Sequence, residues 1–562
     1  MVDVLGNTKT KSVLEIGTSV YGAIEKVGDH DWYKVELEAG KTYEFRLHGM
    51  GVDQIDDTYL RLRDAAGSEI ASNDESGSSI WDGFNAHDSR IVFTAATSGV
   101  YYLDAATYLD VISNQPRDPA DATTGDFLLT AVEQNPNGMV FTPDEIAWQL
   151  IDNGNALFGD EPAAFHIGKD RSLTVNIAAL TTEGQALAIA ALKAWTDVTG
   201  IKFVQTTGTA EIAFDDANGG GYANPIFADG VITSATINIG TDVLNDFGTG
   251  FNSYSYETYI HEIGHAIGFG HGGNYNGTAV YGQDNFYLND SLAYSIMSYM
   301  QTQGDEFSGN IVNTFVDADF RYMLTPAIAD IIAIQNLYGD QVQTSTRKGD
   351  TTYGFNSNTG NAALDAAVTF GSDMYFCVYD DSGKDRLDFS QATVDQTINL
   401  NALAASNVLG GKMNLAIARG TVIESALGGS ADDTMIGNKV TNSLSAFGGD
   451  DTLRGGGGND KLLGGIGLDL LNGGTGKDRL TGGADVDLFF FQRGYGRDVI
   501  TDFDAKGGDG LQDFIQIVEG AKFDIERNGH DTVIDFGKGS TLTLLDVKAS
   551  QVTEADFVFL NA

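Results

Sequence analysis

Short runs of alternating apolar and polar residues fill the first part of the chain. They recur at residues 32–37, 43–47, 59–62 and 90–93, and turns rich in Gly, Asp and Asn separate them. A period of two is typical of half-buried β-strands, and turns at short intervals are typical of all-β domains. We therefore predict a β-sandwich over residues 1–133.

The apolar period changes after the linker-like stretch Asn-Pro-Asn-Gly at residues 135–138. Residues 182–199 place Leu187, Ala191 and Trp195 at helical spacing, so we expect an amphipathic helix whose apolar face is core. The other expected elements of this α/β domain, residues 134–341, are strands at 201–204, 211–214 and 235–239 and a last helix at 328–339.

A repeat with a period of nine follows. Residues 428–490 divide into seven consecutive nonapeptides with the template G-G-x-G-x-D-x-U-x, in which U is apolar, although the second and third copies depart from it. Glycine allows left-handed φ and Asp adds a charged oxygen, so stacked turns enclose oxygen cages that suit Ca²⁺. We predict a parallel β-roll over residues 342–545. Its expected calcium ligands are Asp433, Asp451, Asp460, Asp469, Asp478 and Asp487.

The strongest chemical signal is the motif H-E-x-x-H-x-x-G-x-x-H, which begins at His261. On a helix, His261 and His265 project from one face, about one turn apart. Gly268 allows the chain to turn back, so that His271 can join them. Three imidazoles leave one coordination position open, as catalytic zinc requires, and Glu262 is placed to act as general base on a zinc-activated water. An inactive zinc-binding relative is the alternative, and the intact Glu262 argues against it.

Composition and charge narrow the function classes. The chain has 562 residues, enough for several domains, and its 78 acidic and 33 basic residues give a net charge of −45. This charge argues against nucleic acid and anionic membrane surfaces as partners and favours calcium. Cys377 is the one cysteine, so no internal disulfide can form. The first residues lack the apolar stretch of a general secretory signal, and no run approaches the ~18 apolar residues of a membrane span.

The zinc motif, together with Ser-Ile-Met-Ser-Tyr at residues 295–299, resembles the serralysin branch of the metzincin metallopeptidases. The resemblance implies that Met297 lies beneath the zinc ligands. It also implies that Tyr299 is a further zinc ligand, whose phenol stabilises the oxyanion when displaced. Serralysins usually have proline after the third His, whereas this chain has Gly272.

The nonapeptides resemble the repeats-in-toxin β-roll. Segment 346–357 resembles the serralysin segment that joins the catalytic domain to the roll, and segment 380–385 resembles that family's extra calcium loop. Residues 546–562 resemble the uncleaved type I secretion signal of that family. The resemblance implies export through the type I secretion machinery into the extracellular medium. The further calcium ligands that it implies are the carbonyls of Arg347, Gly349 and Thr351 and the carboxylates of Asp380, Asp385 and Glu424.

Segments 28–33, 37–43 and 98–102 resemble the bacterial pre-peptidase C-terminal domain. That domain usually follows a peptidase, whereas here it would precede one. A spacer and an accessory binding module are equally compatible with the sequence.

The leading hypothesis is a secreted, monomeric zinc endopeptidase of serralysin type that acts on protein or peptide substrates and holds one catalytic Zn²⁺ and several structural Ca²⁺. Two alternatives stay open: a non-enzymatic calcium-dependent adhesion protein, and a peptidase that mainly removes its own residues 1–133. The sequence does not specify the cleavage preference, the physiological substrate, the number of calcium ions or the activation route.

Overall fold

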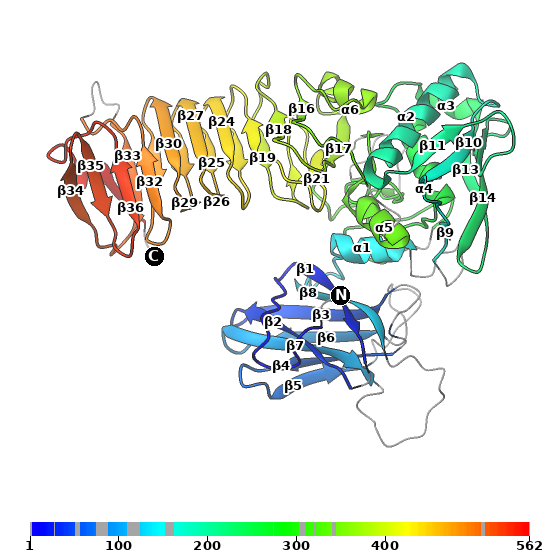
Figure 1. The fold of residues 1–562 in the computed structure, drawn as a ribbon, viewed down its shortest axis with the longest axis horizontal. Coiled ribbons are helices and arrows are strands. Elements are labelled where there is room, and N and C mark those ends of the chain that lie inside the picture. Colours follow the sequence, from blue (N-terminus) through cyan, green and yellow to red (C-terminus); the bar gives the residue numbers. More distant parts are fainter. Residues whose placement is uncertain are drawn as a thin grey trace.

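The computed structural model describes residues 3–26, 28–50, 55, 57–74, 88–108, 124–151, 162–273, 275–302, 311–319, 322–339, 344–506 and 512–560. Within these residues the chain forms three regions in succession (Figure 1). A β-rich N-terminal region lies beside α1, a mixed α/β region follows, and a long stack of strands extends away from it.

The N-terminal region consists of two four-stranded antiparallel sheets that enclose one hydrophobic core. The strand orders are β1-β8-β3-β6 and β2-β7-β4-β5. Val35, Phe45, Leu103 and Phe127 are fully buried in this core. Each strand predicted here is present, which confirms a β-rich N-terminal region. The bounds are β1 (Thr18–Ile24), β2 (Asp31–Leu37), β3 (Thr42–Gly49), β4 (Thr58–Arg63), β5 (Glu69–Asn73), β6 (Ser89–Thr94), β7 (Gly99–Thr107) and β8 (Gly125–Glu133).

The middle region combines a mixed sheet, ordered β11-β10-β12-β14-β13, with helices that pack against it (Figure 1). The bounds are α1 (Pro143–Ile151), β9 (Ala164–Phe165), β10 (Ser172–Asn176), α2 (Thr182–Thr199), β11 (Lys202–Gln205), β12 (Ile212–Asp215), β13 (Gly221–Ala228), β14 (Val231–Ile239), α3 (Thr241–Phe247), α4 (Tyr254–Ala266), β15 (Tyr322–Met323) and α5 (Ile328–Tyr338). The predicted helices at 182–199 and 328–339 and the three predicted strands are present. Strand β13 was not predicted, because it contains Pro225, a residue that strands tolerate mainly at sheet edges, where β13 lies.

The C-terminal region is a stack of short, mostly parallel strands in two long sheets. The orders are β16-β18-β22-β24-β27-β30-β32-β36-β35-β34 and β19-β23-β25-β28-β31-β33-β37. The bounds are β16 (Thr352–Gly354), α6 (Ala362–Ala366), β17 (Met374–Val378), β18 (Arg386–Asp388), β19 (Thr397–Asn399), β20 (Ala405–Ser406), β21 (Leu415–Ile417), β22 (Ser425–Leu427), β23 (Thr434–Ile436), β24 (Ser443–Gly448), β25 (Thr452–Arg454), β26 (Gly457–Gly458), β27 (Lys461–Ile466), β28 (Leu470–Asn472), β29 (Thr475–Gly476), β30 (Arg479–Ala484), β31 (Leu488–Phe490), β32 (Arg497–Ile500), β33 (Phe514–Val518), β34 (Asp524–Asn528), β35 (Asp531–Asp535), β36 (Thr541–Leu544) and β37 (Phe557–Leu560).

The register of these strands follows the repeat. Leu444 pairs with Leu462 and Leu462 with Leu480, so one turn of the stack takes 18 residues, or two nonapeptides. The apolar eighth position of every repeat is buried to at least 99 %. The parallel β-rich C-terminal region predicted from the period is therefore confirmed. Strand β37 pairs with β33, so residues 557–560 of the expected export signal are a strand that ends the second sheet.

A buried charged network joins the N-terminal sandwich to α1. The Arg46 guanidinium has no exposed surface and donates from Nε and Nη2 to the two carboxylate oxygens of Glu145, at 2.6 and 2.8 Å. It also donates to Glu44 at 3.1 Å and to the Val140 carbonyl at 2.9 Å. Charges this deep are tolerated only when they are paired, so the network holds the two regions in one arrangement.

His48 belongs to the same network. From the sequence alone we expect His30, His48 and His87 to be ordinary surface or turn residues, and for His48 this prediction is wrong. Its ring is fully buried, lies 3.0 Å from the Asp88 carboxylate and stacks on Trp148 at 4.4 Å. Burial lowers its pKa, but the carboxylates of Asp88 and Glu145 outweigh burial and raise the pKa to about 9. His30 is partly exposed, and His87 lies outside the described residues.

Helix α1 also contacts the C-terminal region and the zinc motif of its own region. Arg419 of the C-terminal region forms a two-bonded ion pair with Asp144, at 2.7 and 2.5 Å. The backbone N–H of Gly270, next to the last residue of the zinc motif, donates to the Leu150 carbonyl at 2.8 Å. None of the helices in the described residues combines the length and apolar character needed to cross a membrane.

Arg46→Met should destabilise the protein by about 3–5 kcal/mol, because Glu145 loses its two-bonded partner and the remaining cations, His48 and Arg90, satisfy the buried carboxylates only in part. Denaturant unfolding monitored by tryptophan fluorescence measures the change. The control is Lys34→Met, which removes a solvent-exposed pair with Glu36 and should leave the unfolding midpoint nearly unchanged, because water screens that pair. Equal effects of the two substitutions would contradict this account of the interface.

Candidate metal centre

Helix α4 carries the first part of the zinc motif, and two local features set its limits. The Ser253 side chain accepts a hydrogen bond from the Tyr256 N–H at the N-terminus. After Ala266 the chain turns at Gly268, whose φ of 119° is in the region that favours glycine. A side chain at Gly268 would also collide with the Ala163 carbonyl. Glycine is therefore required where the chain leaves the helix to bring His271 back.

The three histidines converge. Their ligand atoms lie within 4.8 Å of one another, and Nε2 of His265 is 3.0 Å from Nε2 of His271. The Nδ1 atoms of His261 and His265 each lie 2.7 Å from a backbone carbonyl, of Ile296 and Phe269 respectively. Because a carbonyl can only accept, Nδ1 carries the hydrogen and Nε2 keeps its lone pair for a metal ion.

Burial keeps these rings neutral. It lowers the pKa of His261 to about 4 and that of His271, where the charge of His261 adds to the effect, to about 3. The pKa of His265 is also well below its usual value, mainly because of burial. Neutral imidazoles with free Nε2 lone pairs are the ligands that zinc takes, so the residues present fit a zinc ion.

Glu262 follows His261 on α4 and lies beside the histidines. Burial raises the pKa of its carboxyl to about 8, and Oε2 is buried without a hydrogen-bond partner. The backbone of edge strand β13 passes close to it, since a side chain at Gly221 would lie 3.3 Å from Glu262 Oε1. A carboxylate oxygen without a partner beside the three histidines is suited to exchanging a proton with a water or substrate group.

Asp330, at the start of α5, holds the turn beneath the histidines. Its carboxylate accepts hydrogen bonds from the Ser295 hydroxyl at 2.6 Å and from the Ile296 N–H at 2.8 Å. Met297 then packs against the zinc helix: a side chain at Gly264 would lie 2.6 Å from the Met297 sulfur and 3.3 Å from Trp195. Gly264, at a variable position of the motif, thus makes room for Met297 beneath the zinc helix.

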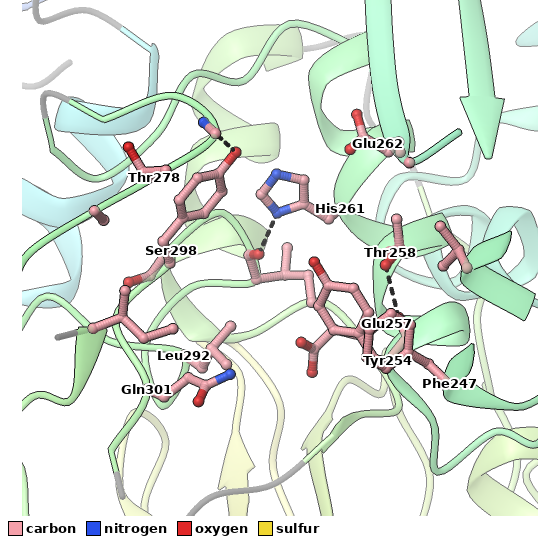
Figure 2. Close-up of a pocket in the computed structure, with 18 of the residues that line it drawn as sticks. Phe247, Tyr254, Glu257, Thr258, His261, Glu262, Thr278, Leu292, Ser298 and Gln301 are labelled. Atoms are coloured by element: carbon pink, nitrogen blue, oxygen red, sulfur yellow. Dashed lines mark hydrogen bonds between the residues drawn. The ribbon is translucent and has the colours of Figure 1, made fainter. Parts of the chain in front are cut away.

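Tyr299, two residues after Met297, lies next to the rings of His271 and His261. Its ring centroid lies 4.6 Å from that of His271 and 5.8 Å from that of His261. The phenol oxygen accepts a 3.4 Å hydrogen bond from the Gly277 N–H, and burial raises its pKa. Figure 2 shows His261 between Glu262 and Ser298, the residue before Tyr299. The structure brings all five predicted site residues together, and direct ligation by Tyr299 stays a prediction.

Close packing explains the departure at Gly272. A side chain there would lie 2.6 Å from the Tyr287 hydroxyl, 2.8 Å from the Asp290 carboxylate and 3.2 Å from the Tyr275 hydroxyl. Asp290 is fully buried and accepts hydrogen bonds from Tyr275 at 3.0 Å and Ser298 at 2.7 Å. This cluster occupies the space that a proline ring would need at position 272.

A cleft of about 460 Å³ opens beside His261 and Glu262. Helix α3, the first turns of α4 and the turn that carries Met297 supply its walls (Figure 2). Phe247, Tyr254, Leu292 and Ile296 make much of this wall apolar. Glu257 is buried in it, and burial raises the pKa of this carboxyl to about 8.

The predicted calcium ligands of the roll share one arrangement. One carboxylate oxygen of each accepts a backbone N–H from the residue 18 positions earlier, as from Asp451 to Asp469 at 3.0 Å, except that Asp433 receives the N–H of Gln396. In Asp451, Asp460, Asp469 and Asp478 the other oxygen is buried without a partner. A side chain on Gly455, Gly464 or Gly473 would collide with the unpartnered oxygen of Asp460, Asp469 or Asp478, respectively. Half-satisfied buried carboxylates fit the oxygen coordination of Ca²⁺.

The row of Asp carboxylates that accept these backbone N–H groups, here called the Asp ladder, continues beyond the predicted repeats. Asp498 and Asp513 accept from the backbone of Asp478 and Asp487, both at 3.0 Å. A strict period of nine does not predict these two residues, because their spacing along the chain grows from 18 to 20 and 26 positions.

Several of the calcium ligands predicted before the nonapeptides also lie close together. Asp385 accepts from the Thr351 N–H at 2.8 Å, its own N–H donates to Glu424 at 2.7 Å, and its Oδ2 is buried without a partner. A side chain at Gly383 would meet both the Gly349 carbonyl and Asp385. Burial, followed by the charges of Asp380, Glu424 and Asp350, raises the pKa of Asp385 to about 7. Asp380 instead accepts from Tyr353 at 2.9 Å, and the Arg347 side chain binds Asp197 at 2.6 Å.

One more acidic group was missed. The carboxylates of Asp3, Glu25 and Asp29 in the sandwich have oxygens within 4.8 Å of one another. They come from the N-terminal segment, the end of β1 and the loop before β2, so no local motif signals them.

Gly264→Ala should destabilise the protein by about 1–3 kcal/mol, because its methyl group would press on Met297 and Trp195 in a packed core. Thermal unfolding measures the loss. The control is Gly208→Ala, where the nearest atom, Thr206 Oγ1, is 3.8 Å away and no strain is expected. A neutral effect of Gly264→Ala would show that the packing beneath α4 adapts.

Without calcium, the roll should lose stability as pH rises from 5 to 8. Burial raises the pKa of Asp451, Asp460 and Asp498 to about 7, above the ~3.9 of an unfolded chain. A raised folded-state pKa stabilises below the unfolded value, and this contribution is lost as pH passes through 7. Circular dichroism melts in EGTA should show the fall, and millimolar calcium should suppress it. A calcium-free protein that is more stable at pH 8 than at pH 5 would refute this.

Comparison with known proteins supports the resemblance found in the sequence. Residues 342–561 match the family model "Peptidase M10 serralysin C terminal", and residues 29–106 match "Bacterial pre-peptidase C-terminal domain". Serralysin of Photorhabdus luminescens is 36% identical over 277 residues, 47% of this chain and 54% of that protein. Metallopeptidase AprA of Pseudomonas marginalis is 37% identical over 280 residues, 46% of this chain and 55% of that protein. Serralysin C of Dickeya chrysanthemi is 42% identical over 190 residues, 33% of this chain and 37% of that protein. The chain spans about half the length of the curated relatives it matches first, and it is a homologue of the serralysins that carries a serralysin-type C-terminal region and a pre-peptidase C-terminal domain near its N-terminus.

Proposed function

We propose that the protein is a secreted zinc metalloendopeptidase of serralysin type, whose middle region is a metzincin catalytic domain. The observation that carries the proposal is the convergence of the ring nitrogens of His261, His265 and His271, next to a cleft that His261, Glu262 and Tyr299 line. The serralysin homologues support the same class of enzyme and imply protein substrates.

In this proposal the three histidines hold the zinc ion. When bound, zinc supplies a Lewis acid and lowers the pKa of a water molecule. Glu262 takes a proton from the attacking water and later delivers it to the leaving amine. The raised pKa of Tyr299 keeps its phenol protonated, so it can donate a hydrogen bond to the carbonyl oxygen as negative charge develops there.

An extended peptide would bind along β13. This strand lies at the edge of the described sheet, and its first residue, Gly221, lines the cleft beside Glu262 together with the preceding Gly220. A sheet edge offers main-chain groups to a peptide of any sequence, and alternate side chains of that peptide then enter pockets. This mode places the scissile carbonyl between β13 and Tyr299.

The Asp ladder and the likeness of the C-terminal residues, which include β37, to a type I secretion signal support export. We propose that the roll binds several Ca²⁺ through the Asp ladder and the Asp385 loop, and that it acquires them outside the cell. Before that, paired buried carboxylates without cations would disfavour the folded stack, which suits passage through the type I secretion machinery. The enzyme is proposed to act as a monomer.

Glu262→Ala should lower the cleavage of casein by about 10²–10⁴-fold while zinc stays bound at one per chain, because the general base is lost and the ligands are kept. Casein degradation and atomic absorption of zinc measure the two effects. Phenanthroline should abolish activity in the wild-type protein, and Glu183→Gln, on the exposed face of α2, should leave it unchanged. Casein cleavage by Glu262→Ala at the wild-type rate would end this mechanism.

A further inference from the structure

The cleft beside the metal centre has an acidic side that the proposed chemistry does not use. Besides Glu262, its lining includes Glu257 from α4 and Asp242 and Asp246 from α3. Among the described lining residues there is no Lys or Arg. The described lining therefore offers acidic groups, and no cationic side chain, to whatever side chain enters the cleft.

Glu257 is the deepest of the three additional carboxylates. Its residue is 5% exposed, whereas Asp242 and Asp246 lie on the exposed face of α3. Its Oε2 accepts a hydrogen bond from the Met323 N–H at 3.0 Å, which fixes the carboxylate in place. The cost of burying this group raises its pKa, and a cation that enters the cleft would relieve that cost.

The rest of the cleft suits a long aliphatic stem. Phe247 and Tyr254 meet edge to face at 4.9 Å, and Leu292 and Ile296 complete the apolar wall. Figure 2 shows Tyr254 and Glu257 next to each other on one side of the cleft, below His261, with Leu292 and Gln301 across from them. Lysine and arginine combine such a stem with a charged head, and aromatic faces attract that head as well.

We propose that Glu257 is a specificity-determining residue, which directs the enzyme to cleave beside Lys or Arg by pairing with that side chain in the cleft. The inference rests on the proposed peptidase function. A peptide bound along β13 next to Glu262 would place one side chain adjacent to the scissile bond in this cleft, where Glu257 meets it.

The first experiment maps the bonds that the full-length wild-type enzyme cleaves in a peptide library, with zinc and calcium present. Lys and Arg should be enriched at one position next to the cleaved bond. Two peptides that differ only at that position, Lys against norleucine, then isolate the charge, because the two stems are alike. The wild-type kcat/KM should favour Lys by about 10- to 100-fold.

Glu257→Gln keeps the size of the side chain and its hydrogen bond to Met323, and it should bring the Lys-to-norleucine ratio close to one. The readout is a ratio within one variant, so a general loss of activity or of folded protein does not alter it. Asp246→Asn, at the exposed rim, should change the ratio by less than about threefold, since solvent screens that charge.

No enrichment of Lys or Arg in the library, or a ratio that Glu257→Gln leaves unchanged, would overturn the proposal. Either result with casein still cleaved would leave the peptidase function intact. Loss of cleavage in both peptides and in casein by the wild-type protein would instead refute the proposed function itself.

Discussion

Two backbone carbonyl oxygens set the chemistry of the histidine motif. The oxygens of Ile296 and Phe269 hold Nδ1 of His261 and His265, so the opposite nitrogens face one point without their hydrogens. Neither carbonyl belongs to α4 itself. One lies in the turn that Asp330 anchors, and the other lies just beyond Gly268. The three histidines can therefore hold a metal ion only when α5, the methionine turn and the turn at Gly268 are all folded.

A second constraint is the burial of carboxylates without cations. Glu262, Asp385 and four Asp residues of the repeats each keep a buried oxygen without a hydrogen-bond partner. Such oxygens destabilise a fold unless metal ions or substrate groups satisfy them. The net charge of −45 is thus not spread evenly as surface charge, since part of it is concentrated in sites prepared for cations.

Features with a short sequence period could be predicted. The helix around Trp195, the alternating strands near the N-terminus and the phased leucines of the roll follow from local spacing, and the structure contains them. The histidine motif could also be predicted, because helical spacing and one glycine determine most of its geometry.

Features that depend on residues far apart in the sequence could not be predicted. Arg46 and Glu145 are 99 positions apart, and each looks like an ordinary surface residue in its own segment. His48 gives no local sign of burial. Gly272 is explained only by Tyr287 and Asp290, which reach it from a later loop. Asp498 and Asp513 continue the Asp ladder after the nonapeptide spacing has ended.

The network around Arg46 bears on the fate of the N-terminal region. A peptide bond cut at residues 135–138 would separate the sandwich from α1 in sequence, but Arg46, Glu145 and the stacked pair of His48 and Trp148 would still join them. A nicked protein would then migrate as two fragments under denaturing conditions and as one particle under native conditions. Shedding of the sandwich would require the buried ion pairs to reach water, which makes it a slow, denaturation-like event rather than a simple release after cleavage.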